Sequence, residues 1–245
     1  MIKRACIVIP MYNEERHARQ SVGTILAGVR SLPAEVRLVL VDDGSADRTR
    51  ALLEECAAAS PDIVTVIVHP RNKGYGAALR TGIAFAIDNG YEYVLFMDSD
   101  LTNHPRYLRA FYDRMLEGVD YIKASRYGKN AGVSGVPWHR RLVSFCGNSV
   151  ARLLSGVPLH DLTNGFRAVK TSLLAKIRLT ENGFAVIMEE LFLVKPLARS
   201  YAEIPYVLTS RTAGQGKTHF TYDLKTYAAY LRYALKSARV RRPVV

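Results

Sequence analysis

The first half of the chain alternates short runs of apolar, mostly β-branched residues with longer stretches of helical periodicity, and this alternation restricts the fold more than any other feature. Each apolar run has the length of a strand, and each intervening stretch has the length of a helix. Such alternation is typical of an α/β fold, in which a mostly parallel central sheet carries helices on both faces. Strands are expected at 5–9, 37–41, 63–68, 93–97 and 121–124, and helices at 17–31, 47–59, 75–89 and 105–117.

The alternation stops near residue 126, and the second half of the chain is less regular. Its glycine-rich stretch is expected to form a mobile loop, and the remainder of this half contains no linker and no internal repeat. We therefore predict one domain over residues 1–218, made of the halves 1–125 and 126–218, and a separate tail at 219–245. Within the second half we expect the loop at 128–137, helices at 138–155 and 183–198, and a strand at 201–208.

The basic residues outnumber the acidic ones and concentrate toward the C-terminus. The formal net charge of +12 favours a polyanionic partner: nucleic acid, anionic lipid or a phosphorylated substrate. From Lys217 onward, Asp223 is the single acid, and tyrosines and leucines recur at helical spacing. The tail is therefore predicted to form a basic amphipathic helix that lies on an anionic membrane surface. Alternatively, this helix packs its tyrosines on the domain.

Other features of the composition favour a cytoplasmic protein. No run of about eighteen apolar residues occurs, and the N-terminus leads directly into a strand pattern without the layout of a signal peptide. The three cysteines, Cys6, Cys56 and Cys146, are odd in number, far apart and set among apolar residues. They support neither a disulfide framework nor a zinc site. We expect a cytoplasmic protein that is peripheral on the cytosolic face of a membrane.

Two carboxylates follow the fourth predicted strand, at Asp98 and Asp100. In an extended segment, residues two apart point the same way, so these carboxylates should converge and repel each other unless a cation or a proton compensates. Mg²⁺ or Mn²⁺ holding a diphosphate would provide that compensation. The alternative is that Asp98 caps the next helix and Asp100 is merely solvated.

Three other strand ends carry polar residues that suit a nucleotide. Parallel α/β sheets bind ligands at the carboxyl ends of their strands. Asp42 is placed to accept hydrogen bonds from a base N–H or from ribose hydroxyls, Tyr12 could stack on the base, and Glu14 could contact base or ribose. Alternatively, each of these three residues is an ordinary surface or helix-capping residue. The loop at 72–74 precedes a helix and brings Gly74 close to a ligand, but it follows the third strand, which disfavours a nicotinamide enzyme.

Further motifs follow in the second half of the chain. Together with those of the first half, they lie at 8–15, 41–45, 72–74, 98–100, 125–127, 138–141 and 161–167, with Arg211 and 214–217. Taken in order, these motifs resemble the family 2 inverting glycosyltransferases of GT-A fold. The later motifs resemble the dolichyl-phosphate mannosyltransferase branch, including its bacterial polyprenyl-phosphate relatives. The resemblance covers residues 1–218 and implies transfer of a hexose from a nucleoside diphosphate sugar, of GDP-mannose or UDP-glucose type, to a polyprenyl phosphate.

The resemblance also assigns roles to individual residues. It implies that 1–125 is the nucleotide-sugar half and 126–218 the acceptor half, and that Asp98 and Asp100 hold Mg²⁺ or Mn²⁺ on the diphosphate. Asp161 would orient the sugar or an arginine, or act as the base for an alcohol acceptor. The donor would be held by Pro10, Tyr12, Glu14, Asp42, Gly74 and Asp98, and the acceptor phosphate by Arg126, Arg140, Arg211 and Lys217.

The chain departs from the family pattern at two positions. Thr102 stands where the family often has Gln, which leaves the third metal ligand open, and Gly216 stands where Ser commonly precedes the lysine. We also expect none of the C-terminal transmembrane helices of some relatives, so a lipid acceptor would be reached through the basic tail or a membrane-anchoring partner.

Two other functions compete with lipid glycosylation. A glycosyltransferase of the same fold could act on a soluble alcohol or a glycan. A non-catalytic nucleotide- or nucleic-acid-binding protein would suit the net charge, but no nucleic-acid motif is present and the acidic strand ends oppose it. We therefore expect no nucleic-acid partner.

Overall fold

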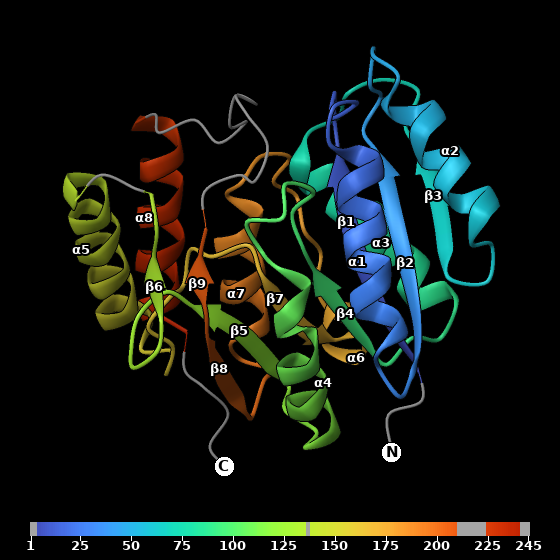
Figure 1. Cartoon of the computed structure of the whole chain (residues 1–245). Coiled ribbons are helices and arrows are strands. Elements are labelled where there is room, and N and C mark those ends of the chain that lie inside the picture. The colour runs from blue at the N-terminus through green and yellow to red at the C-terminus, as the bar shows by residue number, and fades with distance from the viewer. Residues whose placement is uncertain (1–3, 136–137, 210–223, 241–245) are drawn as a thin grey trace.

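The computed structural model describes residues 4–135, 138–209 and 224–240, except the side chains of 139–140 and 224–227. These residues form a seven-stranded sheet with helices on both faces (Figure 1). All strand pairs in it are parallel except those of β7, which runs antiparallel to both its neighbours. The sheet order is β3 (Val64–Val68), β2 (Glu35–Asp42), β1 (Arg4–Met11), β4 (Tyr93–Phe96), β7 (Arg167–Lys170), β5 (Tyr121–Ser125) and β8 (Tyr201–Pro205).

The helices of the first half lie close to the predicted ranges, and the mostly parallel α/β sheet is confirmed. A 3₁₀ turn, η1 (Pro105–Tyr107), opens the fourth helix, because Pro105 stands where its missing N–H costs nothing. The helices are α1 (Ala18–Arg30), α2 (Thr49–Ala59), α3 (Tyr75–Asp88), α4 (Leu108–Leu116), α5 (Trp138–Ser155), α6 (Thr171–Leu174), α7 (Val186–Val194) and α8 (Leu224–Ala238).

The second half holds the differences from prediction. β7 was not expected, because four residues carry too short a pattern to distinguish a strand from a turn. Within the expected loop 128–137, β6 (Gly132–Val133) pairs with β9 (Val207–Leu208) in a separate two-stranded sheet. The strand expected at 201–208 is therefore two strands, β8 and β9, with Tyr206 between them.

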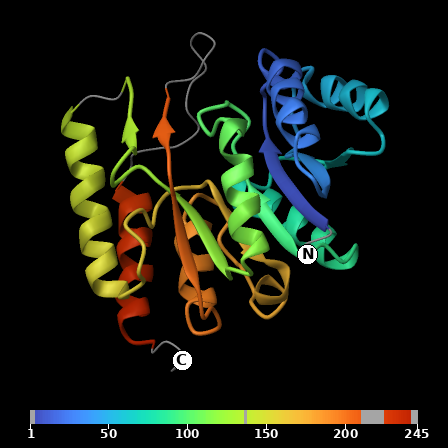
Figure 2. The same ribbon diagram turned by 60° about the horizontal axis from the view of Figure 1, so that its bottom comes forward.

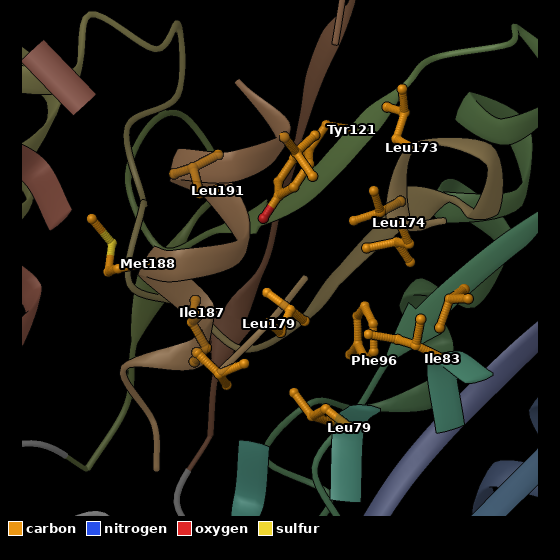
Figure 3. Packing of buried hydrophobic residues seen from close by; sticks show 14 of the residues in the cluster. Leu79, Ile83, Phe96, Tyr121, Leu173, Leu174, Leu179, Ile187, Met188 and Leu191 are labelled. Carbon is orange, nitrogen blue, oxygen red and sulfur yellow. The ribbon is translucent and has the colours of Figure 1, made fainter. Parts of the chain in front are cut away.

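The sheet separates two hydrophobic clusters, and the period-two alternation along β1 divides its side chains between them. Cys6 and Val8 belong to the cluster under α3, α7 and α8, whereas Ile7 and Ile9 belong to the cluster under α1 and α4. Figure 3 shows the first cluster, in which Phe96 of β4 lies beside Ile83 of α3 and near Leu179. Burial on both faces makes the sheet a rigid platform for its loops.

Helices α5 and α8 lie side by side at one end of the molecule, away from α1 and α2 (Figures 1 and 2). Helix α8 falls within the tail predicted at 219–245 and packs against α5 and α7, burying Tyr233 and Ala234. A helix that packs its tyrosines on the domain was the alternative for this tail. None of the helices in the described ranges is long and apolar enough to cross a membrane.

Candidate active site

The carboxyl ends of the parallel strands meet one large cavity of about 1700 Å³. Of the residues predicted to hold the donor, Pro10, Tyr12, Glu14 and Gly74 line it. The carboxylate pair and one predicted acceptor arginine line it as well, as Asp98, Asp100 and Arg126. The sheet thus gathers residues from four separate loops, because β1, β4 and β5 and the loop after β3 all open at the same edge.

Asp98 and Asp100 are each fixed by a neighbour from the loop that follows β4. Asn103 Nδ2 donates to Asp98 Oδ2 at 2.8 Å, while the Thr102 hydroxyl and N–H donate to Asp100 Oδ1 at 2.6 and 3.1 Å. Burial and the negative charge of Asp100 raise the pKa of Asp98 to about 6, although the Asn103 bond opposes the rise. The pair therefore has the mutual repulsion that a divalent cation relieves.

The capping alternative for this pair finds no support in the next helical turn. The side chain that caps η1 is His104, whose Nδ1 accepts from the backbone N–H of Arg106 at 3.1 Å. Neither aspartate serves that turn. Within the described part of the chain, no third His, Cys, Asp or Glu joins the pair to make a metal-binding cluster. Thr102, the departure from the family pattern, instead holds Asp100 in place.

The two adjacent aspartates at the end of β2 have different tasks. Asp42 is buried; its Oδ1 accepts from the Ser45 N–H and hydroxyl at 3.2 and 2.5 Å, whereas its Oδ2 is one of three buried side-chain atoms without a hydrogen-bond partner among the described residues. Asp43 lines the cavity and accepts from the N–H groups of Lys73 and Gly74 at 3.0 and 2.8 Å.

Asp43 is a cavity-lining residue that sequence reasoning did not single out. Its carboxylate shapes the loop that carries Gly74, and it also contacts His69 Nδ1 at 2.6 Å. The signal was present in the doublet Asp42-Asp43: consecutive residues of an extended segment point to opposite sides, so the two carboxylates had to serve different partners. The sequence did not show which of the two carboxylates contacts the loop at 72–74.

On the acceptor side, Arg126 and Asp161 form a buried ion pair. Arg126 Nε and Nη2 donate to Asp161 Oδ2 and Oδ1 at 2.7 and 2.8 Å, and the Arg126 N–H adds a third bond at 3.1 Å. Burial opposes the charge on Arg126, yet the charge and hydrogen bonds of Asp161 raise its pKa. Because both Asp161 oxygens accept from Arg126, the geometry fits orientation of the arginine, one of the three roles predicted for Asp161.

The other predicted acceptor residues can be placed only in part. Arg140 lies in the first turn of α5, and its side chain is outside the described atoms. Arg211 and Lys217 lie outside the described residues. Their contribution to an acceptor site stays a prediction.

A second buried ion pair joins β7 to α7. Arg167 Nε and Nη2 donate to the two carboxylate oxygens of Glu190 at 2.7 and 2.6 Å, and Nη1 donates to the carbonyl oxygen of Gly165 at 2.8 Å. A Cβ at Gly165 would lie 3.3 Å from the hydroxyl of Tyr75 and 3.6 Å from Asp98 Oδ2. This pair thus holds the loop before β7 close to Asp98.

Asn148 of α5 bonds to residues 156–166, a loop in the predicted acceptor half that is called the acceptor loop below. Sequence reasoning did not single out this residue. Its Oδ1 accepts from the N–H groups of Leu162 and Thr163 at 2.8 and 3.2 Å, and its Nδ2 donates to Thr163 Oγ1 at 3.1 Å. The Tyr127 hydroxyl and Ser144 Oγ lie 3.0 Å apart in the same network. The Asn148 amide thus bonds α5 to residues 162 and 163, which are too far along the chain for a local sequence pattern to indicate the contact.

The chain is similar to several characterised proteins. It is 33% identical to a polyprenol monophosphomannose synthase of Mycolicibacterium smegmatis over 88% of this chain and 81% of that protein. It is 30% identical to a dolichol-phosphate mannosyltransferase of Pyrococcus furiosus over 89% of this chain and 61% of that protein.

Solved structures share the fold at lower identity. Glucosyl-3-phosphoglycerate synthase of Mycobacterium tuberculosis, in complex with Mn²⁺, UDP and glucosyl-3-phosphoglycerate, matches with a TM-score of 0.66 at 21% identity. That match covers 99% of this chain and 82% of the solved one. The sequence model named Glycosyl transferase family 2 matches residues 6–178, which is more than half of the chain. The chain therefore belongs to glycosyltransferase family 2.

Proposed function

We propose that the chain transfers a hexose from a nucleoside diphosphate sugar to a polyprenyl phosphate, with inversion at the anomeric carbon. The observation that carries this proposal is the shared cavity, which is lined by the carboxylate pair Asp98 and Asp100 and by the buried cation Arg126. One cavity thus offers a place for a metal-bound diphosphate and a positive charge for a second phosphate. The names of the two relatives support the same acceptor class.

The residues present fit a divalent cation. Mg²⁺ commonly takes only one or two protein carboxylates and completes its octahedron with substrate phosphates and water. Asp98 and Asp100 would supply those carboxylates, and their repulsion adds to burial in raising the pKa of Asp98. When bound, the cation would stabilise the negative charge of the departing nucleoside diphosphate.

Asp42 does not line the cavity, where Asp43 does, but its carboxylate has the chemistry for the role that we propose for it at the nucleoside. A buried carboxylate oxygen without a hydrogen-bond partner is costly, so a ligand donor that reaches it would gain the bond at little further desolvation cost. A base N–H or a ribose hydroxyl has the required chemistry. Gly74 belongs to the loop that Asp43 holds, and it lines the same cavity.

A phosphate monoester acceptor requires placement more than activation. Its second pKa is about 6, so it is largely dianionic at neutral pH and needs no general base. Arg126 would attract and align this dianion, and Asp161 would keep the guanidinium in place. Arg140, Arg211 and Lys217 are proposed to complete the phosphate site. Because Arg126 engages both Asp161 carboxylate oxygens, the geometry favours a phosphate acceptor over an alcohol that requires a base.

The surface of α5 supports contact with a membrane. Trp138, Leu142, Phe145 and Leu153 are exposed on this helix, Trp138 to 73% and Leu153 to 83%. Soluble proteins rarely expose apolar side chains in such a contiguous set unless they bind something. We propose a peripheral location on the cytosolic face of a membrane, where polyprenyl phosphate would enter the cavity from the lipid.

Incubation with nucleotide sugars, Mg²⁺ or Mn²⁺ and polyprenyl phosphate tests the proposal. We expect a lipid-linked sugar with one of the donors, loss of product on chelation, and loss of turnover in Asp100→Asn. The surface variant Asp113→Asn is the matched control, because Asp113 pairs with Arg109 on α4 away from the cavity. Absence of product with all common donors, or transfer only to water-soluble alcohols, would contradict the proposal.

A further inference from the structure

The segment 180–184 connects the donor side of the cavity to helix α8, and it is fixed to α3 through its backbone. Asn182 O accepts from the N–H of Gly76 at 2.7 Å, and Glu181 O accepts from Arg80 Nη1 at 2.6 Å. A Cβ added at Gly74 would lie 2.5 Å from Asn182 O, and one at Gly76 would collide with Glu181 O. Only glycine at these positions lets the segment lie directly on the first turn of α3.

The opposite side of this segment is fixed by α7. The carboxylate of Glu189 accepts from the N–H and hydroxyl of Thr180 at 3.0 and 2.5 Å, and from the N–H of Glu181 at 2.9 Å. The backbone of residues 180–182 is thus bonded to α3 and α7. The side chain of Glu181 remains available for a different partner.

That partner is α8. Glu181 Oε1 accepts from the hydroxyl of Tyr233 at 2.8 Å and forms an ion pair with Arg232. Tyr233 is buried, so its hydroxyl would lose its bond in a desolvated place if the carboxylate were removed. One turn earlier on α8, the hydroxyl of Tyr230 donates to the carbonyl oxygen of Phe184 at 3.3 Å. The middle of α8 is therefore attached to both ends of the segment.

The segment reaches the metal-binding carboxylate through stacked rings. Phe184 stacks on Tyr75, with centroids 4.5 Å apart and an interplanar angle of 25°, and the Tyr75 hydroxyl lies 3.5 Å from Asp98 Oδ1. Phe184, Tyr75, Asn182 and Tyr230 all line the cavity. A continuous set of contacts thus leads from α8 to the site proposed for the diphosphate.

We infer that Glu181 is a positioning residue that couples the docking of α8 to binding of the donor. The inference rests on the proposed function, since it assigns the nucleotide to the Asp98 side of the cavity. Coupling between two sites is reciprocal, so α8 held in place should strengthen nucleotide binding, and bound nucleotide should hold α8 more firmly. A contact at the molecular surface that holds or releases α8 would then change the affinity for the donor nucleotide.

Calorimetric titration of UDP and of GDP, each with Mn²⁺, tests the inference on the full chain. Glu181→Ala should weaken binding of the preferred nucleotide about fivefold or more. Glu181→Gln should stay within about twofold of wild type, because its amide oxygen still accepts from Tyr233 and the exposed pair with Arg232 contributes little. The control Glu117→Ala, which breaks a surface pair with Arg114 on α4, should have no effect.

Further measurements separate positioning from general stability. The donor KM of Glu181→Ala should rise in proportion to the loss of affinity while kcat stays within about twofold. Tyr233→Phe should cause a similar loss, and the double variant should bind no more weakly than Glu181→Ala alone, because both changes remove one bond. Nucleotide with Mn²⁺ should slow amide exchange at residues 228–238 in wild type but not in Glu181→Ala.

The outcomes distinguish this inference from the proposed function. A wild-type protein that binds neither nucleotide would overturn the proposed function and the inference together. Wild-type binding that Glu181→Ala leaves within about twofold would overturn the inference alone. So would an equal loss in Glu117→Ala, or additive losses in the double variant.

Discussion

Lys123 of β5 is fully buried, and its ammonium nitrogen has no hydrogen-bond partner among the described residues. The charges of both buried ion pairs, Arg126 with Asp161 and Arg167 with Glu190, act on it. Burial and the charges of Arg167 and Arg126 lower its pKa from 10.5 to about 7, while Asp161 and Glu190 oppose the shift. The ring of Tyr121 lies 5.8 Å from its nitrogen. The folded state therefore loses the ammonium proton near pH 7, where the unfolded state still holds it.

Because Lys123 is buried, removing its amine should raise the free energy of unfolding by an amount that depends on pH. Below pH 7 the folded and unfolded states both hold the proton, so the cost of burying the charge is present in full. Between pH 7 and 10.5 the unfolded state binds the proton and the folded state does not, so wild-type stability rises with pH. Lys123→Met should raise the free energy of unfolding by about 3 kcal/mol at pH 6, with the gain shrinking toward pH 10.

Urea denaturation of wild type and variant across this pH range checks the prediction. Lys176→Met, which changes an exposed lysine, is the control and should show no such trend. A gain that is independent of pH would show that Lys123 is not the titrating group.

Thr102 is predicted to tune the metal site through Asp100. Its hydroxyl donates to Asp100 Oδ1 at 2.6 Å, and residues that orient a metal ligand typically contribute ten- to hundredfold in affinity. Thr102→Val keeps the shape and removes this bond, so Mn²⁺ affinity in the presence of nucleotide should fall about tenfold. The control Thr24→Val, on the surface of α1, should leave it unchanged. Equal Mn²⁺ affinity in Thr102→Val and wild type would refute this role.

At the level of single residues, the sequence predicted several of the side chains that line the cavity but not how they pair. Asp98, Asp100 and the residues at other strand ends could be identified because strand ends collect at one edge of a parallel sheet. The pairing of Arg126 with Asp161 could not, because it joins residues 35 positions apart. The separate roles of Asp42 and Asp43 depended on the exact register of β2.

At the level of elements, the attachment of α5 to the acceptor loop depends on one buried amide. Asn148 makes its bonds to Leu162, Thr163 and Tyr127 with almost no exposed surface. Asn148→Ala leaves buried N–H groups without acceptors, so the free energy of unfolding should fall by about 2 kcal/mol.

Urea denaturation at neutral pH measures the effect, with Asn89→Ala as the matched control. Asn89 is exposed and makes one side-chain bond, to the carbonyl oxygen of Phe85, so its removal should cost less than about 0.5 kcal/mol. Similar losses in the two variants would show that α5 is held by its packing rather than by the amide.

The elements themselves were predictable where each had a periodic pattern of adequate length. The first five strands and their helices lie within a few residues of the expected ranges, because apolar runs and helical stripes are local properties. The insertion of β7 between β4 and β5 was not predictable. Strand order is decided by packing across the whole sheet, and residues 167–170 reveal neither their neighbours nor their direction.

At the scale of the whole molecule, α5 and α8 place apolar and basic side chains on the same end. Leu153 of α5 and Leu235 of α8 are exposed, and neither lines the main cavity. Arg152 and Lys236 are exposed next to them in the sequence. Apolar side chains beside cations favour the surface of an anionic bilayer. Because α5 also lines the cavity through Leu142 and Phe145, such contact would bring the cavity to the lipid.

Flotation with vesicles of phosphatidylcholine and anionic phosphatidylglycerol measures this contact. The double variant Leu153→Ser/Leu235→Ser should bind at least about tenfold more weakly, since partial burial of two leucines contributes roughly 2 kcal/mol. Nucleotide affinity should not change, and higher salt should weaken wild-type binding because the cations are screened. Leu116→Ser, which alters an exposed leucine at the C-terminal end of α4, should bind like wild type. The membrane would be excluded as the partner of this surface if wild-type protein did not float with the vesicles. It would also be excluded if light scattering showed a dimer that buries this surface.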